Sequence, residues 1–321
     1  MYERSALMFL YCVSPLHMGA GTALGAIDNP IQRERHTRHP MIVGSGIKGA
    51  LRHACAARPV DNGDGRRLSL VFGPETERSS EHAGALSVGD AQIVCFPVRS
   101  LKQTFVYATC PTALARLQRL AAVAFNGMPS DFPKRAIPQV APDAAVVLHN
   151  ELLSQDGLVL EAFRFARASS GEPELREFAE WIAAKAVPSQ PAYFSDKLRK
   201  HLVLLHDDWF NHFVQHATVV EPHVRINDAS GTADEGGLFY TENLPPESLL
   251  VSLLMASRSR RESKQGQSGT QPDEPPPMTA DEVLKYVGRH TETGWLQLGG
   301  DATTGRGQVV VRIVRPEAKE K

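Results

Sequence analysis

Residues 16–52 of this chain read LHMGAGTALGAIDNPIQRERHTRHPMIVGSGIKGALR, and they say more about its fold and function than any other stretch. The stretch combines a glycine-rich turn, one isolated carboxylate at Asp28, a run of Arg and His side chains and the start of a helix. Glycines that expose the backbone beside clustered cations are typical of surfaces that bind phosphates. The stretch therefore predicts a nucleic-acid surface with one candidate catalytic acid.

The overall composition is that of an ordinary globular protein and gives no global sign of nucleic-acid binding. The 321 residues are 42% hydrophobic and 22% charged, with a formal net charge of −1. Attraction for phosphates must therefore come from local clusters of cations. One cluster comprises Arg33, Arg35, His36, Arg38 and His39, a second Lys48, Arg52 and His53, and a third Arg258, Arg260, Arg261 and Lys264.

Cysteine usage and the first residues favour a cytoplasmic protein. The four cysteines form no C-x-x-C pair, which argues against a zinc module or a disulfide framework and fits a reducing compartment. The apolar run within residues 1–19 is more typical of a first core strand than of a signal peptide. No segment approaches the roughly 20 apolar residues that span a bilayer, so we expect no membrane partner.

Hydrophobic periodicity predicts an α+β fold with an antiparallel sheet. Strands are expected at 6–14, 86–98, 103–109, 144–149, 158–165, 248–256 and 309–314. Helices are expected at 44–58, 112–124, 172–186, 207–216 and about 279–290, with Ser45 as the N-cap of the first. Residues 58–67 have the composition of a polar connection.

Two further segments have distinctive patterns. Residues 217–245 predict two strands, VVEPHVRI and GLFYTENL, joined by a long polar tip at about 226–237. Connections of that length are usually functional or disordered. Residues 257–278 are charged, low in complexity and rich in proline, and they predict a disordered loop.

Several short motifs resemble known catalytic signatures but lack essential parts. The segment GAGTALG does not have the dinucleotide-binding spacing, and GDATTGRG at 300–307 has Arg306 and Gly307 where a P-loop needs Lys and Ser or Thr. The S-x-x-K sequence from Ser45 to Lys48 lacks its companion motifs. His212 and His216 share a helix face without the glutamate of a zinc hydrolase.

Four motifs together resemble one known family. They are the block at 16–52, VFGPE at 71–75, GLFYTENLP at 237–245 and LQLGGDATTGRGQV at 296–309. From its first strand to its last, the chain resembles the backbone subunits of the Cmr effector complexes of type III-B CRISPR systems, within the RAMP superfamily. The resemblance implies a single domain over 1–321 with a ferredoxin-like (RRM-like) core, an antiparallel sheet, inserted helices and a protruding thumb hairpin at about 217–245.

The resemblance also implies partners and an activity. Copies of the chain are expected to stack along a CRISPR RNA beside other Cmr subunits, with each thumb entering the duplex between guide and target. Single-stranded target RNA would then be cleaved at regular intervals. Asp28 matches the family aspartate that supports this cleavage, and His17 matches a histidine near the same site. Tyr240 and Glu242 are possible neighbours of the site.

The expected RNA contacts lie in three segments. The first glycine turn, the start of the first helix and the last glycine turn would approach the guide backbone, with cations on phosphates. The residues expected to make these contacts are Gly19, Gly21, Arg33, Arg35, Ser45, Gly46, Lys48, Arg52, Gly300, Gly305, Arg306 and Gly307.

A ribonuclease needs little protein chemistry because RNA carries its own nucleophile, the 2′-OH. The protein must align the 2′-oxygen, phosphorus and 5′-oxygen, assist proton transfer and neutralise developing charge. Asp28 would act as a base or as a weak ligand of Mg²⁺ or Mn²⁺, because one carboxylate does not hold such an ion tightly. The expected products are a 2′,3′-cyclic phosphate and a 5′-OH. Two alternatives stay open: a non-catalytic RNA-binding scaffold, and an endonuclease that processes precursor CRISPR RNA.

Overall fold

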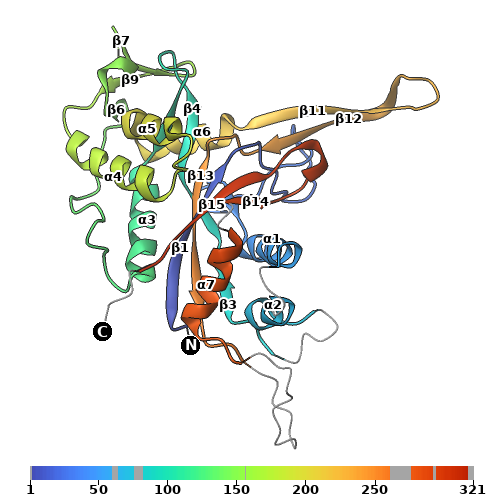
Figure 1. Cartoon of the computed structure of the whole chain (residues 1–321). Coiled ribbons are helices and arrows are strands. Elements are labelled where there is room, and N and C mark those ends of the chain that lie inside the picture. The colour runs from blue at the N-terminus through green and yellow to red at the C-terminus, as the bar shows by residue number, and fades with distance from the viewer. Residues whose placement is uncertain are drawn as a thin grey trace, which may run out of the picture.

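The computed structural model of the chain describes residues 2–59, 64–75, 82–155, 157–260, 276–291 and 294–316. These residues form a large mixed sheet with helices on both faces and a two-stranded hairpin that projects from one side (Figure 1). The strands are β1 (Arg4–Cys12), β2 (Met41–Ile42), β3 (Leu86–Val88), β4 (Ala91–Arg99), β5 (Phe105–Thr109), β6 (Ala144–Val147), β7 (Leu153–Ser154), β8 (Gly157–Leu160), β9 (Phe163–Arg167), β10 (Leu202–Leu205), β11 (Val219–Ile226), β12 (Ala233–Asn243), β13 (Leu249–Ala256), β14 (Trp295–Gln297) and β15 (Gln308–Val314). The helices are α1 (Gly44–Ala57), α2 (Asp64–Phe72), α3 (Pro111–Ala124), α4 (Glu172–Lys185), α5 (Ala192–His201), α6 (Asp207–His216) and α7 (Ala280–Thr291), with short 3₁₀ turns η2 (Asn150–Leu152) and η3 (Ala302–Thr304).

The main sheet has the strand order β14-β15-β1-β13-β4-β5-β10-β6-β9-β8-β7, with β2 paired to β4 and β3 to β13. β1 lies between β13 and β15 and is antiparallel to both. The pairs β5–β10 and β6–β9 are parallel, so the prediction of an antiparallel sheet was wrong for these two pairs. Parallel neighbours require a long crossover, and the chain between β5 and β10 supplies one that includes α3, α4 and α5.

The opening strand is hydrophobic and buried from Ala6 to Cys12, because helices cover both faces of the sheet. Met8 and Leu10 pack into the core on the side of α1 and α7, whereas Leu7 and Phe9 pack on the side of α3 and α4 (Figure 1). A strand buried on both faces has a continuous hydrophobic sequence in place of an alternating one. Each such side chain contributes about 1.5–3 kcal/mol when it is fully buried, so β1 anchors the loop that follows it.

Most predicted elements are present. Two predicted strands are each split in two, and some elements of the structure were not predicted. The strand expected at 86–98 breaks at Gly89 and Asp90 into β3 and β4, and the one expected at 158–165 breaks at Glu161 into β8 and β9. Glu161 has a φ of 52°, which marks a turn in the middle of the apolar run. Also missed were α5 (AYFSDKLRKH), which carries few apolar residues, and β10 (LVLL), an apolar run of only four residues. The residues expected to form a polar connection include the start of α2.

Helix α1 begins at Gly44, as predicted, but Ser45 is not its N-cap. The capping position is Val43, which makes no side-chain cap. The carboxylate of Asp90 takes over this role, with Oδ1 accepting the N–H of Gly44 at 2.7 Å. Gly44 lies so close to the backbone carbonyl of Val88 that no side chain fits there, which explains the glycine at this helix start.

The hairpin predicted at 217–245 is present as β11 and β12, and it projects away from the sheet (Figure 1). Its tip is shorter than the expected 226–237, because only residues 227–232 lie between the two strands. The pairing shifts register between Val224 and Ile226, which lets β12 extend toward the tip. One face of the hairpin is apolar and exposed, with Val220, Val224 and Leu238 between 43% and 53% accessible.

The segment predicted as a disordered loop, 257–278, is ordered at both ends. The N–H of Ser259 donates to the carbonyl of Met278, and the N–H of Met278 donates to Oγ of Ser259. Both residues are buried. Residues 261–275, and with them Arg261 and Lys264, lie outside the described residues.

The described part of the chain contains no helix that is both long and apolar enough to cross a membrane.

Candidate functional site at the base of the hairpin

The glycine-rich segment after β1 lies along the free edge of β12. Leu16 and Leu244 exchange two backbone hydrogen bonds of 2.9 and 2.8 Å. Further along, the N–H of Asn29 donates to the carbonyl of Tyr240 at 3.0 Å, and the N–H of Glu242 donates to the carbonyl of Asn29 at 2.9 Å. The segment predicted to be a loop therefore acts as an irregular third strand beside the hairpin base.

Asp28 is fixed to this edge by hydrogen bonds to Tyr240. The N–H of Tyr240 donates to Oδ2 of Asp28 at 2.7 Å, and the N–H of Asp28 donates to the carbonyl of Tyr240 at 3.1 Å. Among the described residues, no hydrogen bond reaches Oδ1, and the side chain is half-buried. One carboxylate oxygen thus holds the position while the other is open to a reaction partner.

His17 is held by Glu242, which lies two residues beyond Tyr240 on β12. Its Nδ1 lies 2.7 Å from the carbonyl oxygen of Glu242, and since a carbonyl only accepts, Nδ1 carries the proton. In the neutral ring, Nε2 then carries the lone pair. Gly19 is needed beside it, because a Cβ there would lie 2.8 Å from Nε2. Since residues two apart on a strand are separated by roughly 7 Å, Asp28 and His17 bracket a short stretch of β12.

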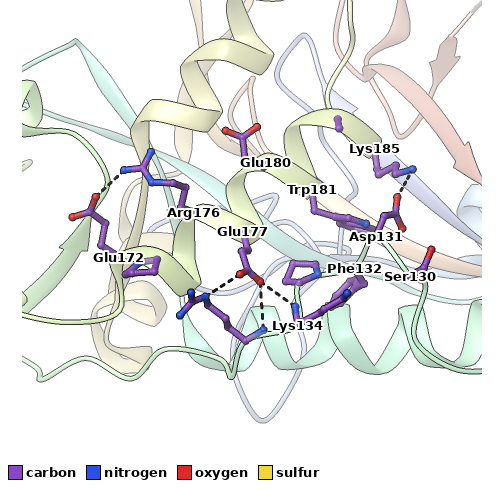
Figure 2. Close-up of a pocket in the computed structure, with 14 residues that line it drawn as sticks. Ser130, Asp131, Phe132, Lys134, Glu172, Arg176, Glu177, Glu180, Trp181 and Lys185 are labelled. Atoms are coloured by element: carbon purple, nitrogen blue, oxygen red, sulfur yellow. Dashed lines mark hydrogen bonds and ion pairs between the residues drawn. The ribbon is translucent and has the colours of Figure 1, made fainter.

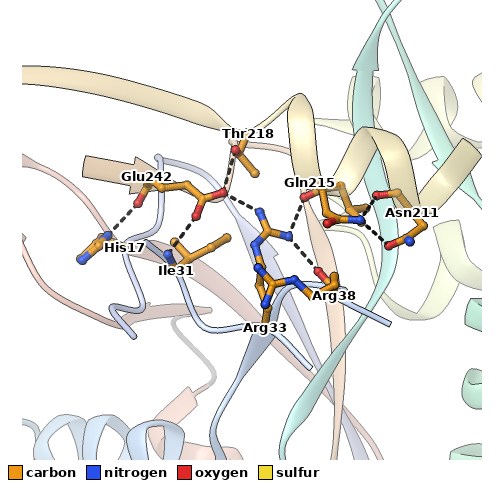
Figure 3. Close-up of polar contacts among 9 residues, drawn as sticks. His17, Ile31, Arg33, Arg38, Asn211, Gln215, Thr218 and Glu242 are labelled. Carbon is orange, nitrogen blue, oxygen red and sulfur yellow. Dashed lines mark hydrogen bonds and ion pairs between the residues drawn. The ribbon is translucent and has the colours of Figure 1, made fainter. Parts of the chain in front are cut away.

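Glu242 and Arg33 form a buried ion pair behind these two residues (Figure 3). Nη2 of Arg33 lies 2.5 Å from Oε1 of Glu242, and their side chains are 7% and 4% exposed. Nη1 of Arg33 donates to the carbonyls of Arg38 and Val214. The expectation of an RNA contact therefore does not fit Arg33, because its guanidinium is turned inward and engaged with the protein. Glu242 is a neighbour of the site, as expected, but a buried one.

The other predicted cations differ in their exposure. Arg35 is exposed, and among the described residues its side chain has no polar partner. Arg52 donates to the carbonyls of Gly73 and Pro74. Lys48 is half-buried, and burial together with the neighbouring Arg52 lowers its pKa. Ser45 and Gly46 lie on the first turn of α1, where the Asp90 carboxylate already occupies the N–H of Gly44.

His39 does not lie in a solvated basic loop with His36. It is buried, with its ring 5.2 Å from that of Phe210 on α6. Burial and the charge of Arg116 lower the pKa of His39 to about 4, so the residue is neutral at pH 7. His36 is 74% exposed.

The last glycine turn packs against the same region. The N–H of Gly300 donates to the carbonyl of His17 at 3.0 Å, and the N–H of Gly307 donates to the carbonyl of Pro15 at 2.8 Å. Gly305 and Gly307 have φ values of 82° and 74°, which only glycine adopts without strain. Arg306 is engaged with Glu221 of β11, at 2.6 and 2.7 Å to the two carboxylate oxygens. A phosphate contact by Arg306 would have to replace this bidentate pair.

Tyr240 presents its side chain to solvent with 36% exposure, on the same hairpin face as Leu238. Gly21 lies in the exposed stretch before Asp28, with a φ of 90°.

Sequence reasoning missed Asp90 and Thr218, whose hydroxyl donates to Glu242. Neither has a local signal, because both act through contacts with distant parts of the chain.

The oxygen and nitrogen donors at the hairpin base determine whether a metal ion could bind there. The described residues contain no group of three or more His, Cys, Asp or Glu side chains placed to hold a metal ion. Asp28 offers one open carboxylate oxygen, and His17 offers Nε2. Such a set suits an ion whose remaining ligands are water and substrate oxygens.

A separate groove of about 850 Å³ lies on the other side of the sheet, between residues 130–135 and α4 (Figure 2). Phe132 and Trp181 line it, and its charged side chains pair with each other, as Lys185 does with Asp131 at 2.6 Å. Its residues come from segments that do not contribute to the hairpin base. The groove is therefore not part of the candidate site.

Sequence and fold together match one class of protein. A family model described as the RAMP superfamily matches residues 9–310. The chain belongs to the RAMP superfamily and, within it, to the Cmr4 family. The relative that shows this is the CRISPR system Cmr endoribonuclease Cmr4 of Pyrococcus furiosus, 31% identical over 97% of this chain and 96% of that protein.

Solved structures agree with this assignment. The crystal structure of oligomeric Cmr4 from Pyrococcus furiosus has a TM-score of 0.69 at 26% identity, covering 97% of this chain and 98% of the other. A chain in the cryo-EM structure of the type III-B Cmr-beta complex bound to cognate target RNA also has a TM-score of 0.69, at 17% identity and with coverage of 97% and 98%. The second likeness supports the fold.

Proposed function

We propose that the chain is a repeated backbone subunit of a type III-B CRISPR ribonucleoprotein that binds CRISPR RNA and cleaves complementary target RNA at regular intervals. The observation that carries the proposal is Asp28, held by hydrogen bonds on the edge of the strand that continues into the projecting hairpin. A scaffold needs no half-buried carboxylate with an open oxygen at that position. The name of the Pyrococcus relative, an endoribonuclease, supports the same activity.

The topology supports a ferredoxin-like core and a thumb. The strands β15-β1-β13-β4 lie side by side, and α1 and α7 pack on one face of them. Numbered along the chain, with β4 second and β13 third, this is the order 4-1-3-2 of a ferredoxin-like fold. We assign β11 and β12 as the thumb, because their exposed apolar face has no partner within the described chain and suits contact with unstacked bases.

We assign guide binding to the first turns of α1 and to the glycine segments beside it. Ser45, Gly46 and Lys48 lie in the first turns of α1, where the helix dipole favours phosphate. Arg35, from the preceding segment, and Arg52, one turn further along α1 than Lys48, would add charge. Gly300 and Gly305 lie in the turn that packs against His17, which supports a close approach of the guide backbone there.

The chemistry we propose uses the 2′-OH of the target RNA as the nucleophile. The thumb would splay the nucleotide so that the 2′-oxygen, phosphorus and 5′-oxygen come into line. Asp28, through Oδ1, would either accept the 2′-OH proton as a base or act as a weak ligand of a metal ion. His17 has its open Nε2 on the same strand edge and would exchange a proton with the reacting oxygens. The products are a 2′,3′-cyclic phosphate and a 5′-OH.

We propose that Mg²⁺ or Mn²⁺, bound weakly through Asp28 and RNA phosphates, supplies neutralisation of the phosphorane charge when it is present. We also place the protein in the cytoplasm. Its four cysteines are buried free thiols, which agrees with a reducing compartment.

The test is reconstitution with a CRISPR RNA, partner Cmr subunits and a complementary RNA, in Mg²⁺ and in EDTA. Wild type should give a metal-dependent ladder of evenly spaced cuts, and Asp28→Ala should bind the target without cutting it. Target binding without cleavage by wild type would leave a non-catalytic scaffold. Cleavage confined to precursor CRISPR RNA would indicate a processing endonuclease instead.

A further inference from the structure

Glu242 connects the Asp28 segment to both strands of the hairpin. Its Oε2 accepts the N–H of Ile31 at 3.0 Å, and its Oε1 accepts the hydroxyl of Thr218, next to β11, at 2.8 Å (Figure 3). Its backbone bonds to Asn29 and to His17. One residue of β12 therefore contacts the chain on both sides of Asp28 and the start of the opposite strand.

Arg33 makes this arrangement electrostatically possible. A carboxylate whose side chain is 4% exposed is costly to bury without an opposite charge beside it, and Arg33 provides that charge from the same segment as Asp28. Through the carbonyl of Val214, Arg33 also ties that segment to the end of α6. The Arg33–Glu242 ion pair and its hydrogen bonds therefore connect the segment that contains Asp28 to three elements: β12, the start of β11 and α6.

We propose that Glu242 and Arg33 are positioning residues that hold Asp28 and His17 in register with the hairpin, so that seating of the hairpin on RNA sets the reacting geometry. The inference rests on the proposed roles of Asp28 and the hairpin. Neither Glu242 nor Arg33 reaches substrate in this arrangement, since both side chains are buried. Their effect on the reaction passes through Asp28, whose two bonds to Tyr240 lie two residues from Glu242 on the same strand.

The test uses Glu242→Gln in the fully assembled ribonucleoprotein, with Glu180→Gln as the matched control, because Glu180 on α4 forms an exposed ion pair with Arg199 away from the hairpin. Glutamine keeps the volume and one acceptor but removes the charge that pairs with Arg33. We expect single-turnover cleavage at saturating target to fall roughly 10- to 100-fold, as misplacement of a reacting group by about 1 Å does. The target Kd should stay within about twofold of wild type, because the lost interaction affects the rate and not the binding.

Arg33→Gln should give a similar loss of rate, and the double variant Arg33→Gln/Glu242→Gln should be no slower than the slower single variant, since both changes break one interaction. Hydrogen–deuterium exchange gives a readout that does not depend on activity. Amides of residues 27–33 should exchange faster in Glu242→Gln, while those of the tip, residues 227–232, should not change.

Unchanged exchange in residues 27–33, or a wild-type cleavage rate in Glu242→Gln, would overturn the inference. Loss of target binding or assembly in parallel with cleavage would also overturn it, because the pair would then be merely structural. If wild type itself does not cleave, the proposed function fails, and the exchange experiment still decides whether the pair positions the segment.

Discussion

Asp28 and Tyr240 are joined by two hydrogen bonds, one through the Asp28 carboxylate and one through its backbone N–H, at 2.7 and 3.1 Å. The partner groups on Tyr240 are both main-chain atoms, so the strand β12 fixes the carboxylate whatever side chain stands at 240. The residues before Asp28 are exposed, and Leu24 is fully accessible. The position of Asp28 therefore depends on the hairpin base more than on its own loop.

Replacement of Asp28 by asparagine should test the role of the negative charge in cleavage without changing the fold. Asparagine retains an oxygen that accepts the Tyr240 N–H, so the segment should keep its conformation while the negative charge is lost. We expect target cleavage to fall roughly 100-fold or more, with target Kd and melting temperature unchanged. Asp196→Asn, at an exposed position on α5 away from the hairpin, is the control. Cleavage at the wild-type rate by Asp28→Asn would show that the carboxylate charge takes no part in the reaction.

Two glycines in the same segment give a matched test of His17. A Cβ at Gly19 would lie 2.8 Å from Nε2 of His17, whereas a Cβ at Gly25 would meet nothing within 4 Å. Gly19→Ala should therefore displace the imidazole and lower the single-turnover rate by about tenfold, and Gly25→Ala should leave it unchanged. Cleavage by the assembled complex is the measurement. Equal rates for the two variants would mean that the orientation of His17 does not matter.

The core elements could be predicted from the sequence because their signals are local. The continuous apolar run of β1 and the helical spacing of α1 both depend on neighbours in the chain. Asp28 was singled out as a candidate because it is an isolated carboxylate within a motif that resembles that of a known family. The hairpin was found because a polar segment separates two strand-like runs.

The roles of Arg33, Arg306 and His39 could not be predicted, because their partners are distant in sequence. Arg33 pairs with Glu242, 209 residues away, and Arg306 with Glu221, 85 residues away. Within residues 16–52 each cation has the pattern of a phosphate ligand, and only the folded chain shows which are neutralised internally. The same limitation explains why the parallel pairing of β5 with β10 was missed, since register and direction depend on the whole crossover.

Lys48 should contribute to guide binding through charge. No described residue forms a hydrogen bond or an ion pair with its ammonium group, and its lowered pKa reflects partial burial and the nearby Arg52. Lys48→Ala should weaken binding of CRISPR RNA and reduce the slope of log K against log salt by about 1. Lys102→Ala, at an exposed turn, is the control. A salt slope equal to that of wild type would exclude a phosphate contact at Lys48.

Glu247 should make the stability of the fold depend on pH. Burial raises the pKa of its carboxyl from 4.5 to about 7, and the hydroxyl of Tyr11 lies against it. Between those values the folded chain keeps a proton that the unfolded chain releases, so the free energy of unfolding falls as pH rises, by about 1–3 kcal/mol at most.

Glu247→Gln stays neutral at every pH and should lose this dependence. The measurement is the melting temperature at about pH 5 and about pH 8, with Glu235→Gln as the control. Wild type and the control should lose more stability over this range than Glu247→Gln does. The lowered pKa of His39 acts in the opposite direction below about pH 6.5, but it is common to all three proteins and cancels in the comparison. Parallel shifts in wild type and Glu247→Gln would contradict a protonated Glu247 in the folded chain.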